Sequence, residues 1–134
     1  MKKILLDTNA YVRFLSGDEK VLAYLAQADR VYISVFVLGE LFAGFRAGDK
    51  ERQNREILDR FLSKSGVEVL EATSETAEYF GIIKSALRKS ARPIPINDVW
   101  IAAHALEAGA ALVTYDSHFL AVPGLRTWDE IKLE

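Results

Sequence analysis

Short apolar runs alternate with longer amphipathic stretches along this chain. Runs of three or four mostly apolar residues, bounded by polar or turn-forming positions, predict buried strands. They lie at residues 3–6, 31–33, 67–70 and 111–114, with a further edge strand expected at residues 125–127. Strands that alternate with helices indicate an α/β fold, with a central parallel β-sheet flanked by helices.

The stretches between these runs predict six helices, because their apolar residues recur every three or four positions. The expected helices cover residues 8–15, 21–26, 34–48, 50–64, 73–92 and 97–109. Thr8 or Asn9, Ser34 and Asn97 are the expected N-caps, since their side-chain oxygens can accept a hydrogen bond from the first helical turn. Pro93 prevents the fifth helix from continuing.

The composition is that of a globular protein. The 134 residues are half hydrophobic and 27% charged, and we expect one domain over residues 1–134. Without cysteine there is no disulfide framework, no thiolate zinc site and no cysteine nucleophile. Asp7 interrupts the N-terminal apolar run too early for a signal peptide, and no apolar run approaches ~18 residues. We therefore expect a cytoplasmic protein that does not enter the membrane.

The net charge of −2 argues against a strongly basic type of nucleic-acid-binding protein. The charge is unevenly distributed, however, because residues 84–92 contain four basic residues and no acid. Lys84, Arg88 and Arg92 in this run have helical spacing. Either the run is a solvated helix face or it contacts a polyanion, and both interpretations are open at this point.

Four acidic residues lie in otherwise apolar stretches: Asp7, Glu40, Asp98 and Asp116. Asp7 and Asp116 each follow a predicted strand, at the edge of the sheet where ligands bind in parallel α/β folds. Carboxylates are rarely buried unless they are paired or bind a metal. If the four converge, a cation would offset their repulsion. Acids without nearby cysteine or a histidine cluster indicate an oxygen-preferring ion, Mg²⁺ or Mn²⁺.

Each acid also has a structural interpretation. Asp7 and Asp116 could form Asx turns, and Asp98 could stabilise a helix N-terminus. Glu40 is harder to explain in this way, because the helix neighbours within reach of its side chain carry no charge. One ion site accounts for all four residues together.

Other polar residues are weaker candidates. Asn9, Ser34 and Thr114 could hydrogen-bond the acids or position water, but capping and strand-end roles explain them almost as well. We interpret His104 as a packed or surface residue and His118 as a turn residue that could also touch the substrate. The sequence has no nucleophile elbow and no glycine-rich phosphate loop.

The segments that carry the four acids, in their order and spacing, resemble the PIN domain, and more narrowly the VapC-type toxins of toxin–antitoxin modules. They read LLDTN (residues 5–9), SVFVLGEL (34–41), PIPINDVWIAAHAL (93–106) and LVTYDSHF (112–119). The resemblance extends from residue 5 to residue 119 and implies an endoribonuclease that depends on Mg²⁺ or Mn²⁺. It also implies a homodimer inhibited by a cognate antitoxin protein, with RNA as the substrate.

The same resemblance assigns residue roles. It implies Asp7, Glu40, Asp98 and Asp116 as the catalytic and metal-binding residues, and it implies supporting polar roles for Thr8, Asn9, Ser34 and Thr114. Water would be the nucleophile, activated by the metal.

Three alternatives remain on the sequence alone. An aspartyl-phosphate phosphatase would use Asp7 as nucleophile, but Asn9 stands where its DxDxT pattern needs a second acid. A non-toxin nuclease of the same fold is the second alternative, and a catalytically silent binding module is the third. The predicted helix at residues 35–45 also carries more apolar bulk than one core-facing side needs, which indicates either a protein partner or burial on several sides.

Overall fold

The computed structural model describes residues 1–130, apart from the side chain of Glu130. Its sheet has four strands in the order β3-β2-β1-β4. They are β1 (Lys3–Leu6), β2 (Arg30–Ser34), β3 (Val67–Leu70) and β4 (Ala111–Val113). All three pairings are parallel, and Leu5 of β1 lies opposite Tyr32 on one side and Leu112 on the other. The predicted α/β class with a central parallel sheet is confirmed.

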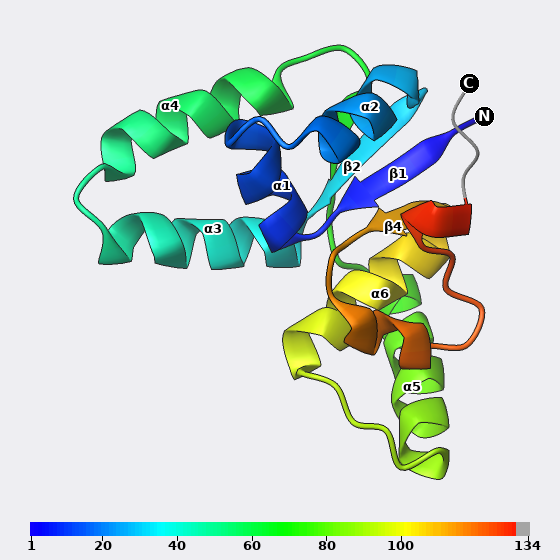
Figure 1. Cartoon of the computed structure of the whole chain (residues 1–134). Helices are drawn as coiled ribbons and strands as arrows, with labels where there is room; N and C mark the ends of the chain where they lie inside the picture. Colours follow the sequence, from blue (N-terminus) through cyan, green and yellow to red (C-terminus); the bar gives the residue numbers. More distant parts are fainter. Residues whose placement is uncertain (131–134) are drawn as a thin grey trace.

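Six α-helices connect the strands of the described part. They are α1 (Thr8–Leu15), α2 (Glu19–Gln27), α3 (Val35–Ala47), α4 (Glu51–Leu62), α5 (Ser74–Lys89) and α6 (Ile96–Ala108). Figure 1 shows α1 and α2 on one face of the sheet and α5 and α6 on the other. Among residues 1–130, none of these helices has the length and hydropathy needed to span a membrane.

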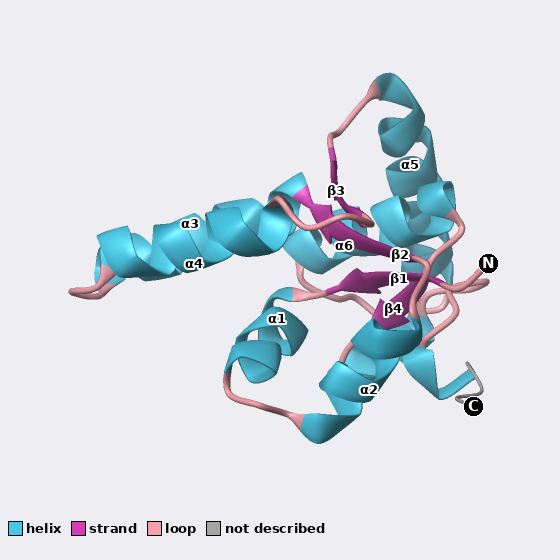
Figure 2. Ribbon diagram, turned by 90° about the horizontal axis from the view of Figure 1, so that it is seen from above, coloured by secondary structure: helices cyan, strands magenta, loops and turns pink. Residues whose placement is uncertain are grey.

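Helices α3 and α4 form a hairpin that extends away from the sheet (Figures 1 and 2). The apolar side chains on α3 that the sequence singles out, Phe36, Leu38, Phe42 and Phe45, are half-buried and pack against the core. The guanidinium of Arg55, on α4, lies 4.3 Å from the centre of the Phe42 ring. Part of the apolar bulk of α3 is therefore covered within the chain.

A buried polar link joins the end of β2 to α6. His104 is almost fully buried, and its Nδ1 lies 2.7 Å from the hydroxyl of Ser34. Its Nε2 lies 3.1 Å from the carbonyl oxygen of Glu71. Burial lowers the pKa of His104, since desolvation penalises its charged form. The interpretation of His104 as a packed residue is correct.

Two helix starts and one strand differ from the predictions. The N-cap of α1 is Asp7 rather than Thr8 or Asn9, because the Asp7 carboxylate accepts a hydrogen bond from the amide of Ala10. The N-cap of α6 is Pro95, which places Asn97 inside the first turn. Proline suits such a position because its missing N–H would not have been used there.

The prediction of an edge strand at residues 125–127 is wrong. This segment makes only an isolated parallel bridge, between Leu112 and Thr127. The amide of Leu112 donates to the carbonyl of Arg126 at 2.8 Å. A 3-10 helix, Trp128–Glu130, begins directly afterwards, so the backbone turns away before a ladder can form.

Candidate active site

The order of the strands indicates a ligand site at the carboxyl ends of β1 and β4. The chain leaves β1 over the face that carries α1 and α2, and it reaches β4 from the face that carries α5 and α6. In open α/β sheets, ligands bind beyond the carboxyl ends of the strands at the point where the strand order reverses, which here lies between β1 and β4. Asp7 follows β1 and Asp116 lies three residues beyond the end of β4, so both lie at this edge of the sheet.

Asp7 is the most buried of the four acids, with 5% of its surface exposed. Burial raises the pKa of its carboxyl group, and the nearby charges of Asp98 and Asp116 raise it further. Hydrogen bonds from Thr114 and from the amide of Ala10 act in the opposite direction. The net shift is upward, so the charged form of Asp7 is disfavoured unless a cation compensates it.

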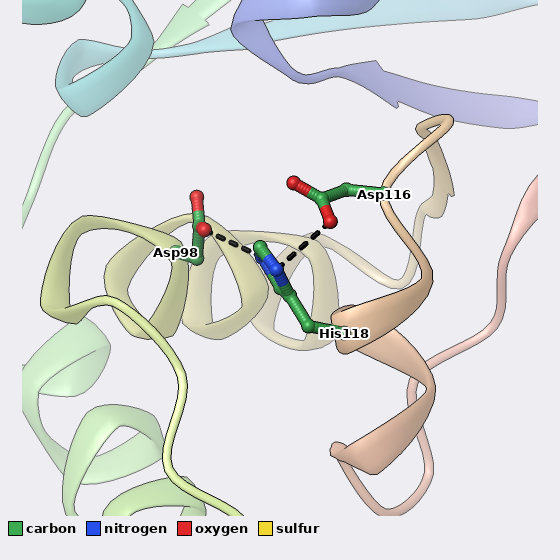
Figure 3. A group of neighbouring side chains, drawn as sticks. All are labelled: Asp98, Asp116 and His118. Atoms are coloured by element: carbon green, nitrogen blue, oxygen red, sulfur yellow. Dashed lines mark hydrogen bonds and ion pairs between the residues drawn. The ribbon is translucent and has the colours of Figure 1, made fainter.

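Asp98 and Asp116 are joined by His118 (Figure 3). Nε2 of His118 lies 2.6 Å from Oδ2 of Asp98, and Nδ1 lies 2.8 Å from Oδ1 of Asp116. Both ring nitrogens therefore face carboxylate oxygens, so the imidazole of His118 links the two acids.

The environment of Asp98 has opposing effects. Burial raises its pKa, whereas the charge of His118 and the hydrogen bond from it lower the pKa. Glu40 and Asp116 raise it again by repulsion, and the net shift is upward. Asp98 is therefore close enough to Glu40 and Asp116 for their charges to raise its pKa. Asp7 is close enough to Asp98 and Asp116 for the same effect. The structure brings all four acids to one edge of the sheet.

Glu40 reaches this edge from α3. Its Oε1 accepts a hydrogen bond from the hydroxyl of Thr8 at 2.7 Å. Thr8 is the first residue of α1, directly after Asp7, so one hydrogen bond ties the α3 carboxylate to the end of β1. Glu40 has no charged neighbour on its own helix, and its hydrogen-bond partner is Thr8 of another helix.

The other expected supporting residues have different positions. Thr114 lies at the site, where its hydroxyl accepts from the amide of Asp116 at 2.9 Å and its side chain hydrogen-bonds Asp7. Ser34 is fully buried and contacts His104 and the amide of Phe36, so its contacts are those of a cap and core residue. Asn9 is exposed and lines a hollow beside Asp116.

The donors at this edge fit a hard divalent cation. Asp98, Asp116 and His118 each offer a ligand atom, and these atoms lie within 4.8 Å of one another. Carboxylate oxygens suit Mg²⁺ and Mn²⁺, whereas imidazole suits softer ions. His118 is therefore better placed to orient the two carboxylates than to bind the ion itself.

The sequence interpretation of His118 as a turn residue missed its place in the site. His118 lies in a short 3-10 helix, Ser117–Ala121, immediately after Asp116. Its position two residues beyond an acid was a usable signal, because a tight turn there returns the side chain toward that acid. Asp98, its second partner, lies 20 positions earlier and gives no local signal.

Comparison with known proteins identifies the family of this chain. Residues 4–125 match the family model of the PIN domain. Ribonuclease VapC2 of Rickettsia felis is 32% identical over 133 residues, covering 94% of this chain and 98% of the relative.

Two solved structures are similar over nearly their whole length. VapBC2 from Rickettsia felis, bound to a DNA fragment from its promoter, gives a TM-score of 0.80 at 30% identity, covering 93% of this chain and 96% of that chain. VapBC-1 from nontypeable Haemophilus influenzae gives 0.82 at 27% identity, covering 96% and 99%. The chain therefore belongs to the PIN domain family, among its VapC ribonucleases, as its sequence motifs indicate.

Proposed function

We propose that this protein is an endoribonuclease toxin that hydrolyses RNA with Mg²⁺ or Mn²⁺ in the cytoplasm. The observation that carries the proposal is the convergence of four carboxylates at the carboxyl ends of β1 and β4, with the pKa values of Asp7 and Asp98 both raised. Such a cluster is costly to maintain without a cation. The names of the relatives support RNA as the substrate.

Asp7, Asp98 and Glu40 would hold the ion directly or through water, and Asp116 would bind a second ion or orient water. When bound, the cation polarises the scissile phosphate and lowers the pKa of the attacking water. Thr8 positions the carboxylate of Glu40, and His118 positions those of Asp98 and Asp116.

Water, rather than the ribose 2′-hydroxyl, is the nucleophile in this scheme. Water attacks phosphorus and the ribose 3′-oxygen leaves, so the products are a 5′-phosphate and a 3′-hydroxyl. Preference for RNA then has to arise from contacts with its shape and backbone.

We also propose a cognate antitoxin as the protein partner and a homodimer as the toxin's assembly. The antitoxin is supported by the two VapBC structures to which the chain is similar. The half-buried aromatic side chains along α3 are a suitable surface for an amphipathic segment.

The direct test is cleavage of a mixed RNA pool by purified protein with Mg²⁺, with Mn²⁺ and with EDTA. We expect cleavage with either ion, none in EDTA, and none from Asp98→Asn. The matched control is Asp29→Asn, on the surface at the opposite edge of the sheet. Cleavage that persists in EDTA, or 2′,3′-cyclic phosphate ends, would contradict the mechanism.

A further inference from the structure

A hollow of about 540 Å³ lies beside the acid cluster, outside the four carboxylates that the reaction needs. It is lined by Asn9, Val12 and Arg13 of α1 and by Tyr115 and Asp116 after β4. Because Asp116 lines the hollow and also contacts His118, the hollow opens directly onto the reaction site. Its volume lies within the range of about 300–1,000 Å³ that is typical of small-ligand sites.

Arg13 supplies the positive charge in the lining. Its guanidinium lies 4.2 Å from the centre of the Tyr115 ring, and its Nη1 lies 3.7 Å from Oδ2 of Asp18. The side chain remains 54% exposed. An arginine has five N–H donors, and the distance to Asp18 is longer than a hydrogen bond, so these donors are available to a ligand.

Tyr115 holds this arginine in place. Its hydroxyl donates a 2.8 Å hydrogen bond to Oδ2 of Asp18, and its ring packs at 90° against that of Trp128 at a centroid distance of 4.9 Å. The ring is therefore held by its hydroxyl and by Trp128, while the guanidinium of Arg13 lies over it. A guanidinium held in this way is suited to bind an oxyanion.

We propose that this hollow binds the nucleotide adjacent to the scissile phosphate, with Arg13 contacting the neighbouring backbone phosphate of the RNA. This inference rests on the proposed ribonuclease function. A cluster of carboxylates repels a polyanion, and Arg13 is the basic residue among those that line the hollow. The carboxamide of Asn9, exposed in the same lining, can hydrogen-bond the sugar or base.

A purely structural role for Arg13 is the competing interpretation. An ion pair at 3.7 Å with a half-exposed arginine contributes little to folding. A structural role predicts an effect on stability and none on RNA binding. A role in binding the substrate predicts weaker RNA binding and little change in stability.

The test measures binding of a short, fluorescein-labelled single-stranded RNA that the wild type cleaves. Dissociation constants are measured at several salt concentrations with Mg²⁺, in the Asp98→Asn background so that the RNA stays intact. The variants are Arg13→Gln, Arg13→Lys and Tyr115→Phe. Arg52→Gln is the matched control, since Arg52 is 95% exposed on α4 and also faces an acid, Glu56.

We expect Arg13→Gln to raise the dissociation constant roughly tenfold, the loss of one charge-assisted contact. The slope of log binding constant against log salt should become shallower by about 0.7, the value for one phosphate contact on a single strand. Arg13→Lys should keep that slope and lose part of the affinity. In the active enzyme, Tyr115→Phe should raise KM and leave kcat unchanged, because Tyr115 is a positioning residue. Arg52→Gln should change none of these values.

Equal affinity and salt slope for Arg13→Gln and Arg52→Gln would overturn the proposal. Thermal melts establish that each variant is folded. Should Arg13→Gln not fold, an unchanged KM in both Arg13→Lys and Tyr115→Phe would overturn it instead. A wild-type protein that cleaves no RNA with either ion would reject the proposed function itself, which is a distinguishable result.

Discussion

The hydroxyl of Thr8 donates a 2.7 Å hydrogen bond to Oε1 of Glu40, 32 positions later in the chain. This bond connects the start of α1 to the second turn of α3, across the carboxyl ends of β1 and β2. Glu40 has no charged residue within one helical turn, so its orientation depends on a partner from another element. A carboxylate that is held in this way is preorganised for a ligand.

Replacing Thr8 by valine removes this hydrogen bond at nearly constant shape. We expect the cleavage rate with Mg²⁺ to fall about tenfold, since the loss of one hydrogen bond to a charged group is of that size. Thr8→Ser keeps the hydroxyl and should retain most of the activity. Rates from single-turnover cleavage, with thermal melts of both variants, test this. Equal activity of Thr8→Val and wild type would show that Glu40 needs no positioning.

Asp7→Asn should stabilise the protein when no metal is present. The pKa of Asp7 lies above its ordinary value of 3.8 in the folded state. Such a group lowers the free energy of unfolding as the pH rises above 3.8, and the penalty disappears below that value, where both states are protonated. Asparagine keeps the acceptor for the amide of Ala10 and removes the charge.

Urea unfolding in EDTA at a series of pH values measures this effect. The variant should be more stable than wild type by about 1–2 kcal/mol near pH 7, with the difference shrinking toward pH 4. With Mg²⁺ the wild type should gain more than the variant, and the variant should not cleave RNA. A variant less stable than wild type at neutral pH in EDTA would mean that the charged carboxylate acts mainly as a helix cap.

His118→Ala should destabilise the metal-free protein by about 1–2 kcal/mol, because Asp98 and Asp116 would face each other without the imidazole between them. Added Mg²⁺ should remove most of that difference, since a divalent cation offsets the same repulsion. Thermal melts in EDTA and in Mg²⁺ compare the two conditions. Leu120→Ala, at a neighbouring residue that is 68% exposed, is the control and should behave as wild type. A difference that Mg²⁺ does not alter would assign His118 to packing alone.

Ser34→Ala separates core support from catalysis. The hydroxyl of Ser34 caps α3 and is the partner of Nδ1 of the buried His104. Its removal should cost about 2–3 kcal/mol of stability, because a buried polar atom loses its partner and a helix loses its cap. The cleavage rate of the folded variant should stay within about twofold of wild type, since the hydrogen bonds of the Ser34 side chain within residues 1–130 go to His104 and to the amide of Phe36 rather than to the four acids. A large loss of kcat without loss of stability would restore Ser34 to the site.

The strands show how much of the fold can be predicted from local sequence patterns. Each of the four strands of the sheet was predicted within about one residue at either end, because short apolar runs bounded by polar residues identify buried parallel strands. The edge strand expected at residues 125–127 does not form, because this segment has a single apolar residue, Leu125, and the backbone turns into a 3-10 helix at Trp128.

The sequence by itself identified the four acids, because a carboxylate in an apolar stretch is conspicuous wherever the chain later places it. It also placed Asp7 and Asp116 after strands, and therefore at one edge of the sheet. Only the tertiary structure decided that Thr8 holds Glu40, that His118 links Asp98 to Asp116, and that Ser34 belongs to the core. These contacts join residues that are distant in the sequence or lie on opposite sides of a turn. Their formation depends on how helices pack against the sheet, which no local periodicity encodes.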